Sequence, residues 1–235
     1  MTKIAIMQPY LFPYIGYMQL ICAVDKFVVY DDVSFIKQGW INRNRILLNC
    51  NEQTFTVPLK NASSFVPINK TEINTSLYAG WQVKFLKTIT QAYAKAPFFK
   101  EVYGLVHNVL NSPCQTISEL CVAALQRICA YLGIHTEFVL SPSIYNNNEL
   151  KAQARVIDIC QKEGAKTYIN AIGGMELYSK DDFRNAGLEL RFIKPQSITY
   201  QQFSCNFIPW LSVIDVLMFN SPDETMRLLQ QYEMK

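Results

Sequence analysis

The first thirty residues constrain the fold more than any other part of the chain. Residues 4–7 form a short apolar run that ends before Pro9, as expected of a buried strand. Pro9 and Pro13 then require an extended loop, because proline fixes φ and disfavours helix in the residue before it. Residues 14–24 have helical character, and residues 27–30 form a second apolar strand. This strand–loop–helix–strand unit predicts the start of an α/β sheet.

The alternation of strands and helices returns after a middle section with a different pattern. Residues 46–48 and 54–57 predict a hairpin, and three helical patterns follow it at 77–94, 97–110 and 117–132. Further strands are expected at 136–140, 168–170 and 188–193, and further helices at 149–163, 179–187, 210–219 and from 221 onwards. A length of 235 residues suits one core, which is sufficient up to roughly 250–300 residues. We predict a single α/β domain over 1–235, Rossmann-like, with a mostly parallel sheet flanked by helices and with 77–132 as a helical insertion or cap.

Ligands of such sheets bind beyond the carboxyl ends of the strands, which selects the loops 8–14, 31–45, 141–148 and 171–179. The last of these follows Asn170 and contains Gly173 and Gly174. Two adjacent glycines permit the close approach of a phosphate or a sugar. The segment matches neither a P-loop nor a GxGxxG fingerprint, so it is a weak indication when taken alone.

The loop after the first strand is rich in aromatic residues. Tyr10 and Tyr14 offer stacking surfaces for a nucleobase or a sugar ring, and Gln8 lies where backbone N–H groups at a helix start can hold an anion. Gly16 would let a ligand or another backbone approach the first helix closely. The alternative is that the prolines rigidify this loop and that its rings belong to the core.

Two adjacent carboxylates, Asp31 and Asp32, follow the second strand. Carboxylates at this position can bind Mg²⁺, orient a ribose or act as a base. Since side chains alternate along a strand, only one of the two can face a given site. A polar strand end or a helix cap is the alternative interpretation.

A basic segment follows directly and contains Lys37, Trp40, Asn42, Arg43 and Arg45. If the segment is extended, Arg43 and Arg45 face the same side and can form a clamp for phosphate or carboxylate. The alternative is a solvated hairpin edge, where basic side chains prevent further strand pairing. Because the segment adjoins the acidic pair, we favour one site that contains both.

A second basic pair, Lys151 and Arg155, has the i,i+4 spacing that places both side chains on one helix face. Acidic residues lie nearby in the sequence, so a solvated helix face is the stronger alternative to a binding role for this pair.

Composition argues against several other classes. The two histidines, His107 and His135, have no Cys or carboxylate at metal-ligand spacing, which disfavours a zinc site or a Ser-His-Asp hydrolase. A net charge of +3 makes nucleic-acid binding improbable. The apolar N-terminal stretch is too interrupted for a membrane span.

The cysteines point to the compartment. The seven cysteines show no CxxC spacing, and we expect packed, reduced thiols in a cytoplasmic protein, with Cys114 and Cys205 in less regular segments.

Residues 7–17, 30–33 and 39–45 carry the motifs QPxxFPxxGY, YDDV and GWINRNR, which resemble the WbqC-like protein family. Residues 168–174 and 207–215 are similar to the C-terminal pattern of that family, so the resemblance covers essentially the whole chain. Members occur among bacterial genes for surface polysaccharides. The resemblance therefore implies a role in making or decorating glycans.

The opening unit also resembles, more distantly, nucleotidyltransferases of the pantothenate synthetase type, in which an HxGH loop holds the phosphates of ATP. Gly16 would correspond to the glycine of that loop. Neither histidine is present, and Tyr14 and Tyr17 are the nearest residues. Amide donors or the basic segment would have to replace the imidazoles.

We therefore expect a transferase or amide-forming ligase that uses ATP or a nucleotide-sugar, with Mg²⁺, and transfers an acyl or aminoacyl group to an amino sugar of a nucleotide-sugar. In this hypothesis Lys37, Arg43 and Arg45 neutralise phosphate charge, and Asp31 or Asp32 binds Mg²⁺ or accepts a proton. The alternatives are nucleotidyl transfer without an acyl step and a non-catalytic module that binds a nucleotide-sugar. The sequence leaves the oligomeric state open.

Overall fold

The computed structural model describes residues 2–204 and 206–235. Among these residues the main sheet has six strands in the order β5-β2-β1-β6-β7-β8. The strands are β1 (Lys3–Met7), β2 (Lys26–Val29), β5 (Glu137–Val139), β6 (Thr167–Ala171), β7 (Glu189–Pro195) and β8 (Tyr232–Met234). All neighbouring pairs are parallel except β7 and the edge strand β8. The chain builds outward from β1 through β2 to β5 and then crosses to β6 on the other side of β1, which makes β1/β6 the switch point of the sheet.

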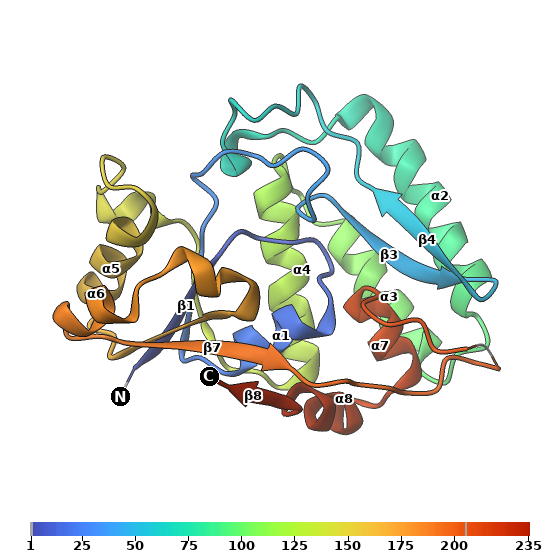
Figure 1. Cartoon of the computed structure of the whole chain (residues 1–235). Coiled ribbons are helices and arrows are strands. Elements are labelled where there is room, and N and C mark those ends of the chain that lie inside the picture. Colours follow the sequence, from blue (N-terminus) through green and yellow to red (C-terminus); the bar gives the residue numbers. More distant parts are fainter. Residues whose placement is uncertain (1, 205) are drawn as a thin grey trace.

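Helices cover both faces of this sheet (Figure 1). One face packs against α1 (Ile15–Cys22), α4 (Ile117–Leu132), α7 (Val213–Phe219) and α8 (Pro222–Leu229), and the other against α5 (Ala152–Lys162) and α6 (Lys180–Asn185). Residues of β1 alternate between the two cores: Ala5 belongs to the first, and Ile4 and Ile6 belong to the second. A strand that is buried on both faces has to be apolar throughout, which explains the unbroken run in the sequence.

The middle section lies between β2 and β5. It contains the hairpin β3 (Arg43–Leu48) and β4 (Asn51–Thr56), then α2 (Thr75–Tyr93), α3 (Phe99–Leu110) and α4. The two turn residues of the hairpin, Asn49 and Cys50, have φ of 51° and 60°, the signature of a two-residue type I′ turn. Phe55 of the hairpin packs on Phe85 of α2 with ring centroids 4.5 Å apart.

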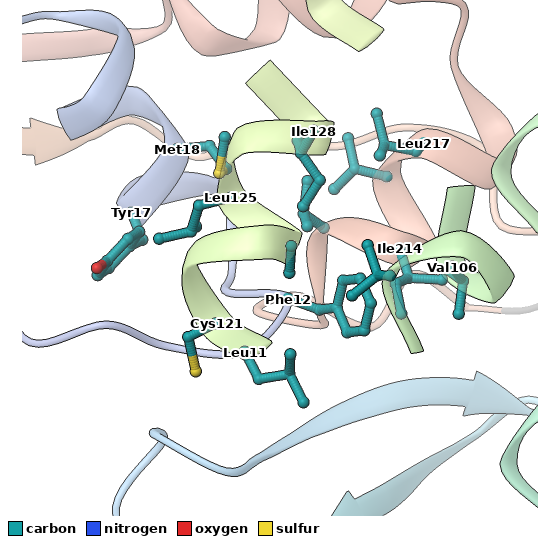
Figure 2. Close-up of a cluster of buried hydrophobic side chains, with 14 of the residues drawn as sticks. Leu11, Phe12, Tyr17, Met18, Val106, Cys121, Leu125, Ile128, Ile214 and Leu217 are labelled. Carbon is teal, nitrogen blue, oxygen red and sulfur yellow. The ribbon is translucent and has the colours of Figure 1, made fainter. Parts of the chain in front are cut away.

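These helices share the larger hydrophobic core with α1 and α7. Figure 2 shows Phe12 beside Val106 of α3 and Ile214 of α7, and Met18 of α1 beside Leu125 of α4. All five side chains are fully buried or nearly so. The helical section therefore does not form a separate core but continues the core on one face of the sheet.

The α/β fold with a mostly parallel sheet is confirmed. The observed α4 has the predicted bounds, because Thr116 and Glu119 form a capping box at its start and Gly133, with φ of 70°, ends it. Helix α7 begins at Val213 rather than at residue 210, because Ser212 caps it by accepting a hydrogen bond from the N–H of Ile214. Three 3₁₀ helices, Ile68–Lys70, Pro142–Tyr145 and Ile172–Leu177, were not predicted.

Of the six cysteines among the described residues, five are free and one is disulfide-bonded. Cys121, Cys129 and Cys160 are free and buried, as predicted, and Cys22 and Cys114 are free and half-buried. Cys50 contradicts the expectation of reduced thiols, since it is disulfide-bonded at the exposed turn of the hairpin. Cys205 lies outside the described residues. No helix in the described part of the chain is long and apolar enough to cross a membrane.

Candidate functional site

A cavity of about 410 Å³ lies at the switch point of the sheet. Met7, the last residue of β1, and Ala171, the last residue of β6, both line it. Its other lining residues are Tyr10, Tyr14, Tyr17, Leu20, Trp40, Asn44, Arg45 and Trp210. This cavity, called the switch-point cavity below, occupies the position at which open α/β sheets bind ligands.

Aromatic side chains form most of its wall. Tyr10 lies against Tyr17 with ring centroids 5.2 Å apart, and Tyr14 meets the edge of Trp210 at 6.0 Å. Burial raises the pKa of Tyr10 and of Tyr14 above the ordinary tyrosine value, so both phenols are neutral at pH 7. Trp40 and Trp210 remain 38% and 52% exposed. Exposed indoles beside neutral phenols give a cavity that suits a flat ring.

The backbone carbonyl of Phe12 connects the segments that form the cavity wall. It accepts a hydrogen bond of 2.8 Å from Nδ2 of Asn44 and one of 2.7 Å from Oγ of Ser212. Phe12 itself has a φ of 44°, a conformation that costs on the order of 1–3 kcal/mol for a residue with a side chain. Because the donors come from β3 and from the start of α7, this strained residue joins three segments that are far apart in the sequence.

Two guanidinium groups meet the same indole at the edge of the cavity. The Cζ atoms of Arg43 and Arg45 lie 5.4 Å and 5.3 Å from the ring centroid of Trp40, within the range of a cation–π contact. The alternation along β3 thus places the two side chains together, as the sequence predicts. The Nε atoms of both arginines are buried and have no hydrogen-bond partner among the described residues.

Other predicted residues of these two loops serve the scaffold. The carbonyl of Gln8 accepts a 2.7 Å hydrogen bond from the hydroxyl of Tyr17, and the amide of Asn42 donates to the carbonyl of Val57 at 2.9 Å. Lys37 is exposed and does not line the cavity. These contacts fix the shape of the loops, whereas Tyr10, Tyr14, Trp40 and Arg45 face the cavity.

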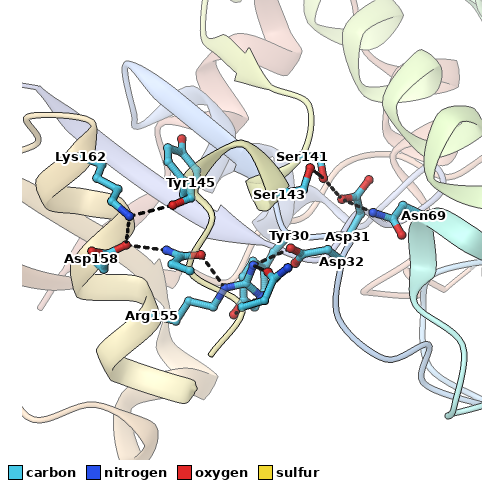
Figure 3. A network of polar contacts seen from close by, with 12 residues as sticks. Tyr30, Asp31, Asp32, Asn69, Ser141, Ser143, Tyr145, Arg155, Asp158 and Lys162 are labelled. Atoms are coloured by element: carbon cyan, nitrogen blue, oxygen red, sulfur yellow. Dashed lines mark hydrogen bonds and ion pairs between the residues drawn. The ribbon is translucent and has the colours of Figure 1, made fainter. Parts of the chain in front are cut away.

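Asp31 occupies a separate network, which Figure 3 shows beside Ser141 and Asn69. Its carboxylate is 4% exposed and accepts hydrogen bonds from the hydroxyls of Ser118 at 2.6 Å and Ser141 at 2.8 Å. Burial raises the pKa of Asp31, and the serine hydrogen bonds oppose that rise. A carboxylate held in this way links the β2 end to α4 and to the loop after β5.

Asp32 is paired with Arg155 (Figure 3). The contact is bidentate, with Nη1 of Arg155 donating to Oδ1 at 3.0 Å and Nη2 to Oδ2. Arg155 is 5% exposed, and its Cζ lies 5.1 Å from the ring centroid of Tyr30. The solvated helix face is therefore wrong for Arg155. Lys151 is exposed and lies just before the first residue of α5, so it does not share a helix face with Arg155.

The structure thus does not bring Asp31 or Asp32 into one site with the basic segment. Neither aspartate lines the switch-point cavity, and nor does Arg155. No group of three or more His, Cys, Asp or Glu suited to hold a metal ion occurs among residues 2–204 and 206–235.

The glycines make room for the protein's own side chains. A Cβ on Gly16 would lie 2.5 Å from Cε2 of Tyr14 and 2.8 Å from Cγ of Pro195, so the missing side chain lets the Tyr14 ring sit against α1. A Cβ on Gly174 would lie 2.7 Å from Nδ2 of Asn170. Gly173 faces open space. At Gly16 and Gly174 the protein's own side chains therefore occupy the space that a Cβ would need.

Sequence reasoning did not assign six of the lining residues to a site, namely Met7, Tyr17, Leu20, Asn44, Ala171 and Trp210. Trp210 comes from the loop before α7, and Asn44 from between the two arginines that the sequence did single out. Trp210 has a φ of 61°, uncommon for a bulky residue, and its carbonyl accepts a hydrogen bond of 3.3 Å from Nη2 of Arg45. The only sequence signal for Trp210 is the resemblance of residues 207–215 to a family pattern.

The fold and the cavity define a doubly wound α/β protein with an aromatic, arginine-edged cavity at its switch point. The model of the WbqC-like protein family matches residues 8–227, and the chain belongs to this family. It is similar to the uncharacterized protein Rv1507c of Mycobacterium tuberculosis, with 29% identity over 224 residues that cover 94% of each chain. No solved structure matches the chain significantly.

Proposed function

We propose that the switch-point cavity binds ATP or a nucleotide-sugar and that the protein is a transferase of surface-polysaccharide biosynthesis. In this proposal it transfers an acyl or aminoacyl group to an amino sugar. The observation that carries the ligand class is the pair of guanidiniums, those of Arg43 and Arg45, on the ring of Trp40. The glycan step rests on membership of the WbqC-like family alone.

Different residues at the cavity would bind different parts of the ligand. The faces of Trp40 and Trp210 offer stacking for a base or a sugar ring, and Tyr14 supports Trp210 from the edge. Arg43 and Arg45 supply the positive charge for phosphate, with Arg45 in the cavity lining and Arg43 beside it on the Trp40 ring. Delocalised guanidiniums that are held on a ring are preorganised, so they would stabilise negative charge as it develops on a transferred phosphoryl or acyl group.

The residues present do not offer a ready magnesium site at the cavity. Carboxylates are missing from its described lining, and Asp31 and Asp32 each have protein partners. We propose that Mg²⁺ enters with the phosphates of the nucleotide, and that Asp31 and Asp32 position the loops around the cavity. Their assignment as metal ligands or as a general base stays a prediction.

One observation favours a non-catalytic binding module as the second candidate. The titratable side chains among the described lining residues are Arg45 and three tyrosines, none of which is an ordinary general base at pH 7. An assay for product formation separates the two candidates. It contains ATP, a carboxylic or amino acid as the source of the acyl group, and a UDP-linked amino sugar as the acceptor. Pyrophosphate release without acyl transfer would indicate nucleotidyl transfer, and binding without turnover would indicate the module.

Thermal unfolding with ATP, UDP-sugars and TDP-sugars, each with Mg²⁺, tests the proposal. A ligand at 100 times its dissociation constant adds about 2.7 kcal/mol to the unfolding free energy. We expect such a shift for the parent protein and its loss in the double variant Arg43→Ala/Arg45→Ala. The matched control is Arg184→Ala, because Arg184 is an exposed arginine with an exposed partner. No shift with any of these nucleotides would overturn the proposal.

A further inference from the structure

A second cavity adjoins the first across Trp210. Its volume is about 340 Å³, within the size range of small-molecule sites. Trp210 lines both cavities, and Ile15 and Tyr14, which are neighbours in the chain, line one each. Most of the remaining wall comes from the loop that follows β7.

The two cavities differ in chemistry. The second is lined by aliphatic and aromatic side chains, among them Ile15, Ile198, Phe207, Leu211 and Val216. Its polar lining residues carry only hydroxyl and amide groups, and its described lining includes no charged side chain. An anion would therefore find no cationic partner there. Burial of an uncharged apolar group, by contrast, is favourable because it removes apolar surface from water.

The wall of the second cavity is anchored from behind. The hydroxyl of Tyr200 donates to the carboxylate of Asp215 at 2.6 Å, and Nε2 of Gln202 donates to the same oxygen at 2.7 Å. The hydroxyl of Tyr93 donates to the other oxygen at 2.7 Å. Because Asp215 is fully buried, this network holds the loop after β7 against α7 and keeps the cavity open in one shape.

Trp210 itself is held in an unfavourable conformation at the boundary. Its φ is 61°, Tyr14 contacts the ring edge, and Arg45 binds its carbonyl. Strained backbone persists where the surroundings fix it and is common at ligand sites. A large aromatic side chain placed between a cationic cavity and a neutral one is suited to separate two chemically different groups.

We propose that the second cavity binds a linear acyl chain, with Ser197 and Thr199 offering hydroxyls to its carbonyl group. The existence of this apolar site is independent of the nucleotide site. Its role as the seat of the acyl group that is transferred rests on the proposed function. The two sites then hold the acyl chain and the nucleotide on either side of one indole.

The test uses uncharged n-alkanamides, from acetamide to octanamide, titrated into the full chain and followed by NMR. The affinity should rise about fourfold for each added methylene, which corresponds to about 0.8 kcal/mol, until the cavity is full. Ser197→Trp fills the cavity and should weaken hexanamide at least tenfold. Thr199→Trp serves as a second filling variant should Ser197→Trp fail to fold. Ser76→Trp, at an exposed position that lines neither cavity, is the control and should bind as the parent does.

The outcomes separate this inference from the proposed function. Arg43→Ala, which leaves the contact of Arg45 with the Trp210 carbonyl in place, should weaken ATP binding and keep hexanamide binding, and Ser197→Trp should do the reverse. If ATP fails to bind the parent while hexanamide still responds to Ser197→Trp, the nucleotide proposal fails and the apolar site stands. Affinity that is independent of chain length, or equal losses in Ser197→Trp and Ser76→Trp, would overturn the apolar site. Tighter binding of benzamide than of hexanamide would overturn its assignment to a linear chain.

Discussion

Arg45 and Glu52 form an ion pair across the β3–β4 hairpin, with Nη1 of Arg45 2.6 Å from the carboxylate. One of the two guanidiniums on Trp40 is therefore already partly neutralised, whereas the structure shows no acidic partner for Arg43 among the described ion pairs. Both members of the pair are partly exposed, so the attraction between them is screened by water. A phosphate at Trp40 would compete with Glu52 for Arg45.

Glu52→Gln should raise the affinity for ATP or a nucleotide-sugar. Exposed ion pairs contribute about 0.2–1 kcal/mol, so the gain should be up to about fivefold, and it should shrink at high salt. Titration calorimetry measures it. Glu72→Gln removes another exposed pair, with Lys60, and should leave the affinity unchanged. A weaker affinity in Glu52→Gln would mean that Glu52 orients Arg45 for the ligand instead of competing with it.

Gly16→Ala should damage both stability and ligand binding. The new Cβ would collide with the Tyr14 ring and with Pro195, so the ring has to leave its position in the cavity wall. Gly104→Ala is the matched control within a helix, because its Cβ meets nothing within 4 Å, and it should stabilise by about 0.5–1 kcal/mol. Denaturant unfolding and nucleotide titration of both variants test this. Unaltered binding in Gly16→Ala would show that the position of Tyr14 is unimportant.

Arg155→Met should destabilise the protein strongly. It leaves the carboxylate of Asp32 without its bidentate partner, and breaking a buried pair in this way costs about 3–5 kcal/mol. Replacing both members, Asp32→Leu/Arg155→Met, should restore much of the loss, since no charge is then left unpaired. Chemical unfolding measures all three proteins. If the double variant is as unstable as Arg155→Met, the network around Asp32 contributes more than the pair itself.

Because the pKa of Asp215 is raised in the folded state, the free energy of unfolding should fall as the pH rises. Burial raises its pKa above the ordinary aspartate value, although hydrogen bonds from Tyr200, Tyr93 and Gln202 oppose that rise. Between the ordinary and the raised pKa the folded state holds a proton that the unfolded state has lost, so raising the pH through this interval costs stability. The parent should lose stability relative to Asp215→Asn across that interval. A constant difference between the two proteins at every pH would contradict the raised pKa.

Local patterns predicted the sheet and its helices. The run at residues 4–7 is buried on both faces, and the capping box at Thr116 fixes the start of α4. Strand β1 and the start of α4 could therefore be predicted from residues that are adjacent in the sequence. The edge strand β8 could not be found in this way, because its three residues pair with β7 some forty positions earlier in the chain. The alternation of Arg43 and Arg45 was also local, and their shared contact with Trp40 agrees with it.

The composition of the site depended on contacts over long sequence separations. Adjacency in the sequence suggested that the acidic pair and the basic segment share one site, but Asp32 turns to Arg155, 123 positions away. Trp210 reaches the cavity because Ser212 binds the carbonyl of Phe12, 200 positions earlier. No periodicity or spacing in the chain encodes such pairings.

A crystal structure of the protein grown with ATP or a UDP-sugar tests the central claim most directly. The account predicts a ring stacked on Trp40 or Trp210 in the switch-point cavity, with phosphate oxygens within hydrogen-bond distance of Arg43 and Arg45. A nucleotide bound elsewhere, for example beside Asp31 and Ser118, or one whose phosphates avoid both arginines, would contradict it.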